Sequence, residues 1–143
     1  MNKIIKALVS IGSIGTIGFG VWHFSVPGQW GWYSYIVPEA TELVLAIGVV
    51  NMFFSLCLVL IGSVNILFVY FSKDRFALIV MLAVSNILWA ARCILQVLYP
   101  QGSMNPALQY GMLAAFLIIF ALFFISLLLV LFQKTPGAKT GRD

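Results

Sequence analysis

Four apolar stretches, each long enough to cross a lipid bilayer, constrain this chain more than any other feature. They cover residues 4–24, 43–71, 76–98 and 107–132, and about 20 helical residues span the ~30 Å hydrocarbon core. In lipid the backbone must pair its polar groups internally, and these stretches lack the alternation of barrel strands, so all four are predicted to be helices. We therefore expect an all-α polytopic membrane protein: one domain over residues 1–143, folded as a four-helix transmembrane bundle with short loops and a flexible tail from about residue 133.

Composition argues against a water-soluble fold and against several function classes. Hydrophobic residues make up 62% of the chain and charged residues 8%, whereas soluble domains carry about 25% charged residues. The net charge of +4 comes from scattered basic residues and not from the basic stripe of a nucleic-acid-binding protein, so no nucleic-acid partner is expected. Cys57 and Cys93 stand far apart inside apolar stretches, which argues against a thiol redox or zinc site.

The basic residues predict the orientation of the spans. Seven of the eight fall on one side of the membrane if the spans alternate: Lys3, Lys6, Lys73, Arg75, Lys134, Lys139 and Arg142. Because Lys and Arg are enriched in cytoplasmic loops, both termini are predicted to be cytoplasmic. The short loops fit a bacterial inner membrane, which is the expected location. Residues 1–24 also resemble a secretory signal, but no small-residue cleavage site follows, so we retain them as a span.

Small and polar residues predict where the helices pack closely. In the first span glycines recur every three residues, which spreads them into a band wide enough to contact two neighbouring helices. In the second span Asn51 and Ser55 share one helix face with Gly48, Gly62 and Asn65. Buried asparagines usually form hydrogen bonds between helices. The predicted packing residues are Gly12, Gly15, Gly18, Gly48, Gly62 and Asn65. The fourth span, apolar almost all round, is expected to be the helix most exposed to lipid or to a partner.

Arg92 is the most unusual residue, because it lies inside the third apolar stretch. Trp89, Arg92, Gln96 and Tyr99 follow at spacings of three, four and three, so they form one stripe. The short turn at 72–75 makes the second and third spans antiparallel neighbours, and their polar stripes are then predicted to meet in the outer half of the membrane. Arg92 would bond to neighbours on both stripes and stack on Trp89. The predicted ligand-binding residues of this pocket are Asn51, Ser55, Trp89, Arg92, Gln96 and Tyr99.

The loop before the second span is expected to lie at the outer membrane interface. Its aromatic residues favour the headgroup region and are predicted to cover the polar pocket. Pro38 is predicted to open the second helix, with its acidic residues in the first turn. By helix rise these acids are too far away to pair with Arg92, so a lipid phosphate or an anionic ligand is its expected partner. The predicted interfacial residues are His23, Trp30, Trp32, Glu39 and Glu42.

Three function classes follow from these features. We rank first a non-enzymatic accessory or scaffold subunit, a homo-oligomer or part of a larger membrane-protein complex, because the first span is rich in glycine and no soluble domain is present. The second is a binder or carrier of a lipid, quinone or other amphiphile in the outer pocket. The third is an oligomeric pore. An enzyme is the least supported class, since no nucleophile with its base appears, and neither a cofactor nor a metal is expected.

Overall fold

The fold is a bundle of long helices. The computed structural model describes residues 2–102 and 105–133, and within them no strand occurs. The elements are α1 (Lys3–His23), α2 (Val26–Gln29), a 3-10 turn η1 (Trp32–Tyr35), α3 (Thr41–Phe71), α4 (Arg75–Leu98) and α5 (Pro106–Phe132). The helices α1, α3, α4 and α5 are each long and apolar enough to cross a membrane. This confirms the predicted all-helical class and the four apolar spans.

Short polar side chains cap three of the long helices. The Asn2 side chain accepts a hydrogen bond from the backbone N–H of Ile4, and Asp74 accepts one from Phe76. Asn105 caps α5 in the same way, and Pro106 occupies its first turn. The start of α3 differs from the prediction: the helix begins at Thr41. Pro38 and Glu39 therefore precede it, and of the two predicted acids only Glu42 lies in its first turn.

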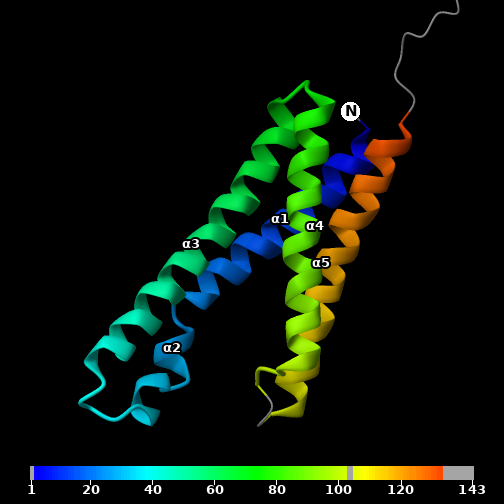
Figure 1. The fold of residues 1–143 in the computed structure, drawn as a ribbon. Coiled ribbons are helices and arrows are strands. Elements are labelled where there is room, and N and C mark those ends of the chain that lie inside the picture. Colours follow the sequence, from blue (N-terminus) through cyan, green and yellow to red (C-terminus); the bar gives the residue numbers. More distant parts are fainter. Residues whose placement is uncertain (1, 103–104, 134–143) are drawn as a thin grey trace, which may run out of the picture.

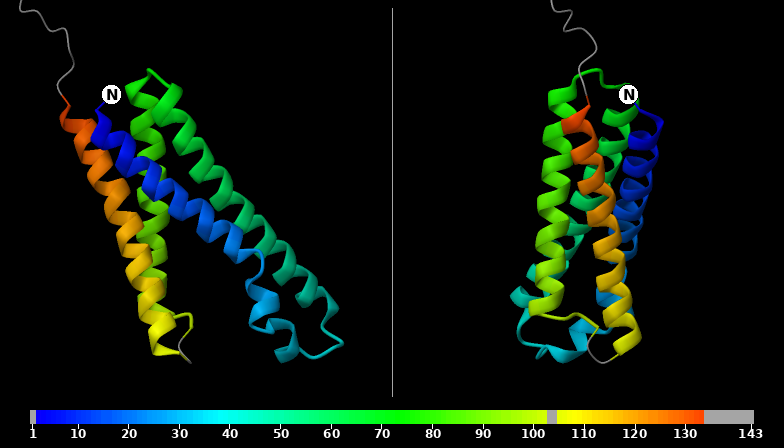
Figure 2. Two further views of the ribbon diagram at one scale, coloured as in Figure 1. Left: turned by 180° about the vertical axis from the view of Figure 1, so that it is seen from behind. Right: turned by 90° about the vertical axis from the view of Figure 1, so that its right-hand side faces the viewer.

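The long helices form two arms that meet at one end and separate toward the other (Figure 1). One arm is α4 with α5, which run side by side along their length. The other is α3 with α1, and α1 crosses from the end of α5 to the far half of α3 (Figure 2). Close contact between α3 and α4 is confined to the end where residues 72–74 connect them. The expectation that their polar stripes face each other in the outer half is therefore wrong.

Glycines explain why α3 packs on α1. A Cβ atom at Gly20 would lie 2.8 Å from the backbone oxygen of Ser55, and one at Gly62 would lie 2.8 Å from the backbone oxygen of Ser13. Only glycine permits backbones to approach this closely. The buried residues of α3 follow the same face: Asn51, Ser55, Leu58, Gly62, Asn65 and Val69. The polar stripe predicted on α3 thus lies largely against α1 and not against α4.

The opposite side of α1 packs on α5 through two further glycines. A Cβ atom at Gly12 would meet the ring of Phe123 at 3.2 Å, and one at Gly15 would meet Ile119 at 3.1 Å. The small-residue band of α1 therefore contacts two helices. Two predicted packing positions behave differently. Gly18 would have no neighbour within 4 Å, and Gly48 meets the Tyr33 hydroxyl of η1 instead of a helix.

Polar bonds connect the helices at the centre of the bundle. The indole N–H of Trp89, a residue only 1% exposed, donates to the Thr16 hydroxyl at 3.1 Å and so links α4 to α1. The Asn65 amide donates to the Ser85 hydroxyl at 2.7 Å and links α3 to α4 near the turn. The latter is the kind of interhelical bond expected of a buried asparagine.

The most exposed long helix is α3, not the predicted fourth span. Six of its 31 residues are buried, compared with six of 27 in α5. A regular stripe of α5 packs inward; its buried residues are Met112, Phe116, Ile119, Phe123, Ser126 and Val130. An apolar sequence all round the helix therefore did not make α5 the most exposed of the four long helices.

The two ends of the described chain, Asn2 and Gln133, lie near the 72–74 turn (Figure 1). Lys3, Lys6, Lys73 and Arg75 belong to the same end of the bundle. The tail predicted from about residue 133, with Lys134, Lys139 and Arg142, lies outside the described residues except for Gln133.

Candidate functional site: a cleft between the two arms

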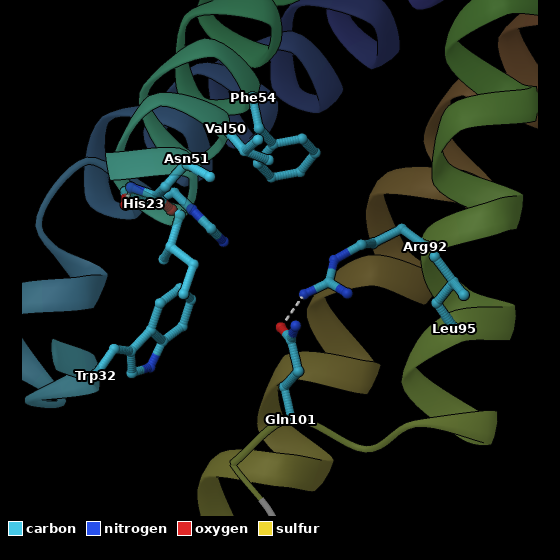
Figure 3. A pocket seen from close by; sticks show the side chains of 10 residues that line it. His23, Trp32, Val50, Asn51, Phe54, Arg92, Leu95 and Gln101 are labelled. Carbon is cyan, nitrogen blue, oxygen red and sulfur yellow. Dashed lines mark hydrogen bonds between the residues drawn. The ribbon is translucent and has the colours of Figure 1, made fainter. Parts of the chain in front are cut away.

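A cavity of about 460 Å³ lies between the two arms at the end where they separate. Figure 3 shows its side chains coming from both sides. On the arm of α1 and α3 its wall includes His23, Trp32, Asn51 and Phe54; on the other arm it includes Arg92, Leu95 and Gln101. Trp32 belongs to η1, so part of the aromatic loop lies against this cavity, in the place where the sequence predicts a cover.

A second cavity, of about 220 Å³, adjoins the first and shares Phe54, Arg92 and Leu95 with it. Its remaining walls are Phe19, Leu58, Leu88, Trp89 and Ala91, all of them apolar or aromatic. Because Leu58 and Leu88 lie nearer the 72–74 turn than Asn51 and Arg92 do, this cavity extends toward the end where the arms meet. The two cavities together, which we call the cleft, have mostly apolar walls. Their polar side chains gather in the larger cavity, at the mouth of the cleft, and apart from Arg92 the deeper cavity is apolar.

Arg92 supplies the positive charge of the cleft, and its contacts differ from those predicted. One terminal nitrogen, Nη2, donates a hydrogen bond to Oε1 of Gln101. The guanidinium carbon lies 4.7 Å from the centre of the Phe116 ring, a cation-π contact with α5 and not with Trp89. Within the described residues Arg92 contacts no carboxylate and bonds to neither Asn51 nor Ser55, because α3 has turned toward α1.

Asn51 and His23 provide the polar groups of the opposite wall. The Asn51 amide donates to the backbone oxygen of His23 at 3.0 Å, which satisfies one of the unpaired carbonyls at the end of α1. The side-chain oxygen of Asn51 and the Nδ1 atom of His23 are buried, and neither has a hydrogen-bond partner among the described residues. Ser55 is fully buried and donates to the Asn51 backbone oxygen of its own helix at 2.7 Å.

Gln96 determines where Gln101 lies. It is 2% exposed, and its amide donates to the backbone oxygen of Gln101 at 3.0 Å and to that of Gln109 at 3.4 Å. Gln96 thus ties the segment after α4 to the first turns of α5. Tyr99 does not line either cavity and is 72% exposed.

Of the six residues predicted to bind a ligand, Asn51 and Arg92 line the larger cavity and Trp89 lines the deeper one. Ser55, Gln96 and Tyr99 line neither. His23, predicted as interfacial, and Trp32, part of the loop predicted to cover the pocket, both line the larger cavity. Sequence reasoning missed Phe54 and Gln101 altogether. Helix periodicity carried no signal for Gln101, because it lies in a loop.

The other predicted interfacial residues lie outside the cleft. The ring of Trp30 packs edge-on against Trp22, with ring centres 6.1 Å apart. Glu39 and Glu42 are exposed at the start of α3 and line neither cavity. In the described part of the chain, no three His, Cys, Asp or Glu side chains lie close enough together to hold a metal ion.

No protein-family model, curated protein or solved structure shows significant similarity to this chain.

Proposed function

We propose that this protein is a small integral membrane protein that binds an amphiphilic molecule, a lipid or a similar long-chain compound, in the cleft between its arms. The observation that carries this proposal is the composition of the walls. A positive charge and several polar groups lie at the mouth, and apolar side chains continue inward from them. An amphiphile has the same division between a polar head and an apolar chain.

The size of the cleft supports the proposal. Ligand sites are typically cavities of about 300–1,000 Å³, mostly apolar, with a few polar groups that fix the orientation of the ligand. The larger cavity, of about 460 Å³, falls in this range. Arg92 supports it as well, because an arginine in a membrane-spanning helix is costly and usually marks a functional position.

We infer that the mouth of the cleft faces the outer leaflet of a bacterial inner membrane. Lys3, Lys6, Lys73 and Arg75 lie at the opposite end, and the positive-inside rule would place that end in the cytoplasm. The aromatic segments α2 and η1 would then lie at the outer headgroup level. An oligomeric pore is less favoured, because the polar side chains Asn51, Ser55 and Asn65 of α3 are buried inside the chain, where they bond to α1, to α3 itself and to α4.

Filling the cleft tests the proposal directly. Ala46 is exposed and lines the larger cavity, so Ala46→Trp would occupy the space without any change of charge. Ala121→Trp is the matched control, since Ala121 is exposed on α5 and lines no cavity of the cleft. We expect native mass spectrometry, after extraction in mild detergent, to show a bound mass on the wild type and on the control variant. Ala46→Trp should lose it.

The same measurement distinguishes the accessory or scaffold role that the sequence ranks first. In that case the chain would carry a second polypeptide and no small molecule, and Ala46→Trp would leave its mass spectrum unchanged. That result would refute amphiphile binding in the cleft.

A further inference from the structure

We propose that the ligand carries an oxyanion head, a carboxylate or a phosphate, and that this head binds Arg92 by replacing Gln101. The inference rests on the proposed function, because it concerns the same cleft. It adds the chemical class of the head, the direction of the chain and the group that competes with the ligand.

The unused hydrogen-bonding capacity of Arg92 points to an oxyanion. Its Nε–H is buried and has no acceptor among the described residues, while Nη2 donates to the single oxygen of the Gln101 amide. These two donors lie on one edge of the planar guanidinium, and a carboxylate or phosphate presents two oxygens that match such an edge. An amide presents only one. Gln101 therefore accepts a hydrogen bond from one of the two donors, whereas an oxyanion would accept from both.

Gln101 is suited to be exchanged. It is a neutral acceptor on an exposed side chain, and a charged acceptor binds a guanidinium more strongly. Its backbone is held independently, because the Gln96 amide bonds to the Gln101 carbonyl oxygen. A rotation of the Gln101 side chain alone would then release Arg92, with no change in the path of the loop. Gln96 acts in this scheme as a positioning residue and not as a contact of the ligand.

Among the residues that the structure describes, no acid competes for the same place. Glu39 and Glu42 do not line the cleft, and Asp74 precedes the first residue of α4. Asp74 is 18 residues before Arg92, which corresponds to about 27 Å along a helix. The Phe116 ring, completely buried, holds the guanidinium from the side of α5. Figure 3 shows the Arg92 side chain reaching from α4 into the space between the arms.

The apolar cavity fixes the direction of the chain. From Arg92 it continues past Phe54 to Leu58, Leu88 and Trp89, toward the end where the arms meet. Arg92 itself is six residues before the end of α4 at Leu98, or about 9 Å by helix rise, close to the headgroup level. The head would therefore lie at the mouth and the chain in the depth, in the orientation of a lipid of that leaflet.

Three probes with the same chain test the head group: oleate, oleyl phosphate and oleyl alcohol. Binding to the purified protein would be followed by tryptophan fluorescence, because Trp32 and Trp89 line the cleft. We expect oleate or oleyl phosphate to bind at least about tenfold more tightly than the alcohol, the factor that one charge-assisted bond supplies. Tighter binding of oleate would indicate a fatty-acid head, and tighter binding of oleyl phosphate would indicate a phospholipid head.

Substitutions at Gln101 test the exchange. Gln101→Glu would give Arg92 a carboxylate partner of its own, so the affinity for the anionic probe should fall by about tenfold or more. Gln101→Ala removes the competitor and should raise that affinity. Oleyl alcohol should respond to neither change. The matched control is Gln29→Glu, which adds the same charge to an exposed residue of α2 outside the cleft.

The outcomes separate this inference from the proposed function. Equal affinities for oleate, oleyl phosphate and oleyl alcohol, unchanged by Gln101→Glu but abolished by Ala46→Trp, would overturn the oxyanion head and leave amphiphile binding intact. A probe affinity unchanged by Ala46→Trp would refute the proposed function itself. A gain with Gln101→Ala cannot result from misfolding, so it would support the exchange even if Gln101→Glu were poorly folded.

Discussion

A single methyl group added to Gly20 should destabilise the protein, whereas the same group at Gly18 should not. A Cβ atom at position 20 would lie 2.8 Å from the Ser55 backbone oxygen and 2.9 Å from the Leu58 Cβ atom. Neither atom belongs to the flexible end of a side chain, so relief requires α1 and α3 to move apart. At Gly18, two residues away on the same helix, the added atom would have no neighbour within 4 Å.

The expected difference between the two variants is large enough to measure. Overpacking a close contact typically costs about 1–3 kcal/mol, and a clash with backbone belongs in the upper part of that range. Alanine regains up to about 1 kcal/mol over glycine in a helix. Gly20→Ala should therefore lower the free energy of unfolding by about 1–2 kcal/mol, while Gly18→Ala should leave it unchanged or raise it by up to about 1 kcal/mol.

Reversible unfolding in mixed micelles of mild detergent and sodium dodecyl sulfate, followed by far-ultraviolet circular dichroism, gives both free energies. The Gly18 variant serves as the control for helix propensity, since both substitutions are identical in chemistry. If Gly20→Ala proved as stable as Gly18→Ala, α1 and α3 would not approach as closely as the structure has them. The close packing of α3 on α1 would then not account for the separation of the two arms.

Three further predictions concern the core and the orientation of the chain. The Phe123 ring is completely buried against Gly12, so Phe123→Ala should lower the free energy of unfolding by about 3–5 kcal/mol in the same assay. Phe132 is 80% exposed, so the control Phe132→Ala should lower it by less than about 0.5 kcal/mol. Trp89→Phe should cost about 0.5–1.5 kcal/mol because it removes the bond to the Thr16 hydroxyl, and combining it with Thr16→Val should cost less than the two single losses added together. Reporter fusions should place both termini in the cytoplasm; termini on opposite sides would contradict an even number of crossings.

Length and hydropathy were sufficient to predict the helices. The predicted spans differ from the observed long helices by at most two residues at each end, because a hydrocarbon core of fixed thickness requires apolar segments of a fixed minimum length. The prediction did not use the short polar residues that cap the helices, such as Asn105 before α5. At the start of α3, Pro38 gave a misleading signal, since the helix begins three residues after it.

The pairing of the helices could not be derived from the connecting turn. The 72–74 turn makes α3 and α4 neighbours at one end, but it does not control how they continue. Gly20 and Gly62 decide that question, because the closest approach available to α3 is on α1. The sequence predicted Gly62 as a packing residue but did not single out Gly20, and nothing in the spacing of the glycines identified the partner helix. This is why the predicted partners of Arg92 on α3 were wrong, although Arg92 itself does line a cavity.

The close packing of α1 on α3 also accounts for the presence of Arg92 in an apolar helix. If α3 had followed α4 along its whole length, the guanidinium would lie between two neutral walls, with its desolvation only partly compensated by Asn51 and Ser55. Because α3 turns away, Arg92 instead borders a cleft between the arms, where its charge remains accessible to an anion. The glycines that bring α1 and α3 together therefore also separate the two arms. In this fold, the same contacts that stabilise one arm keep the proposed binding cleft open.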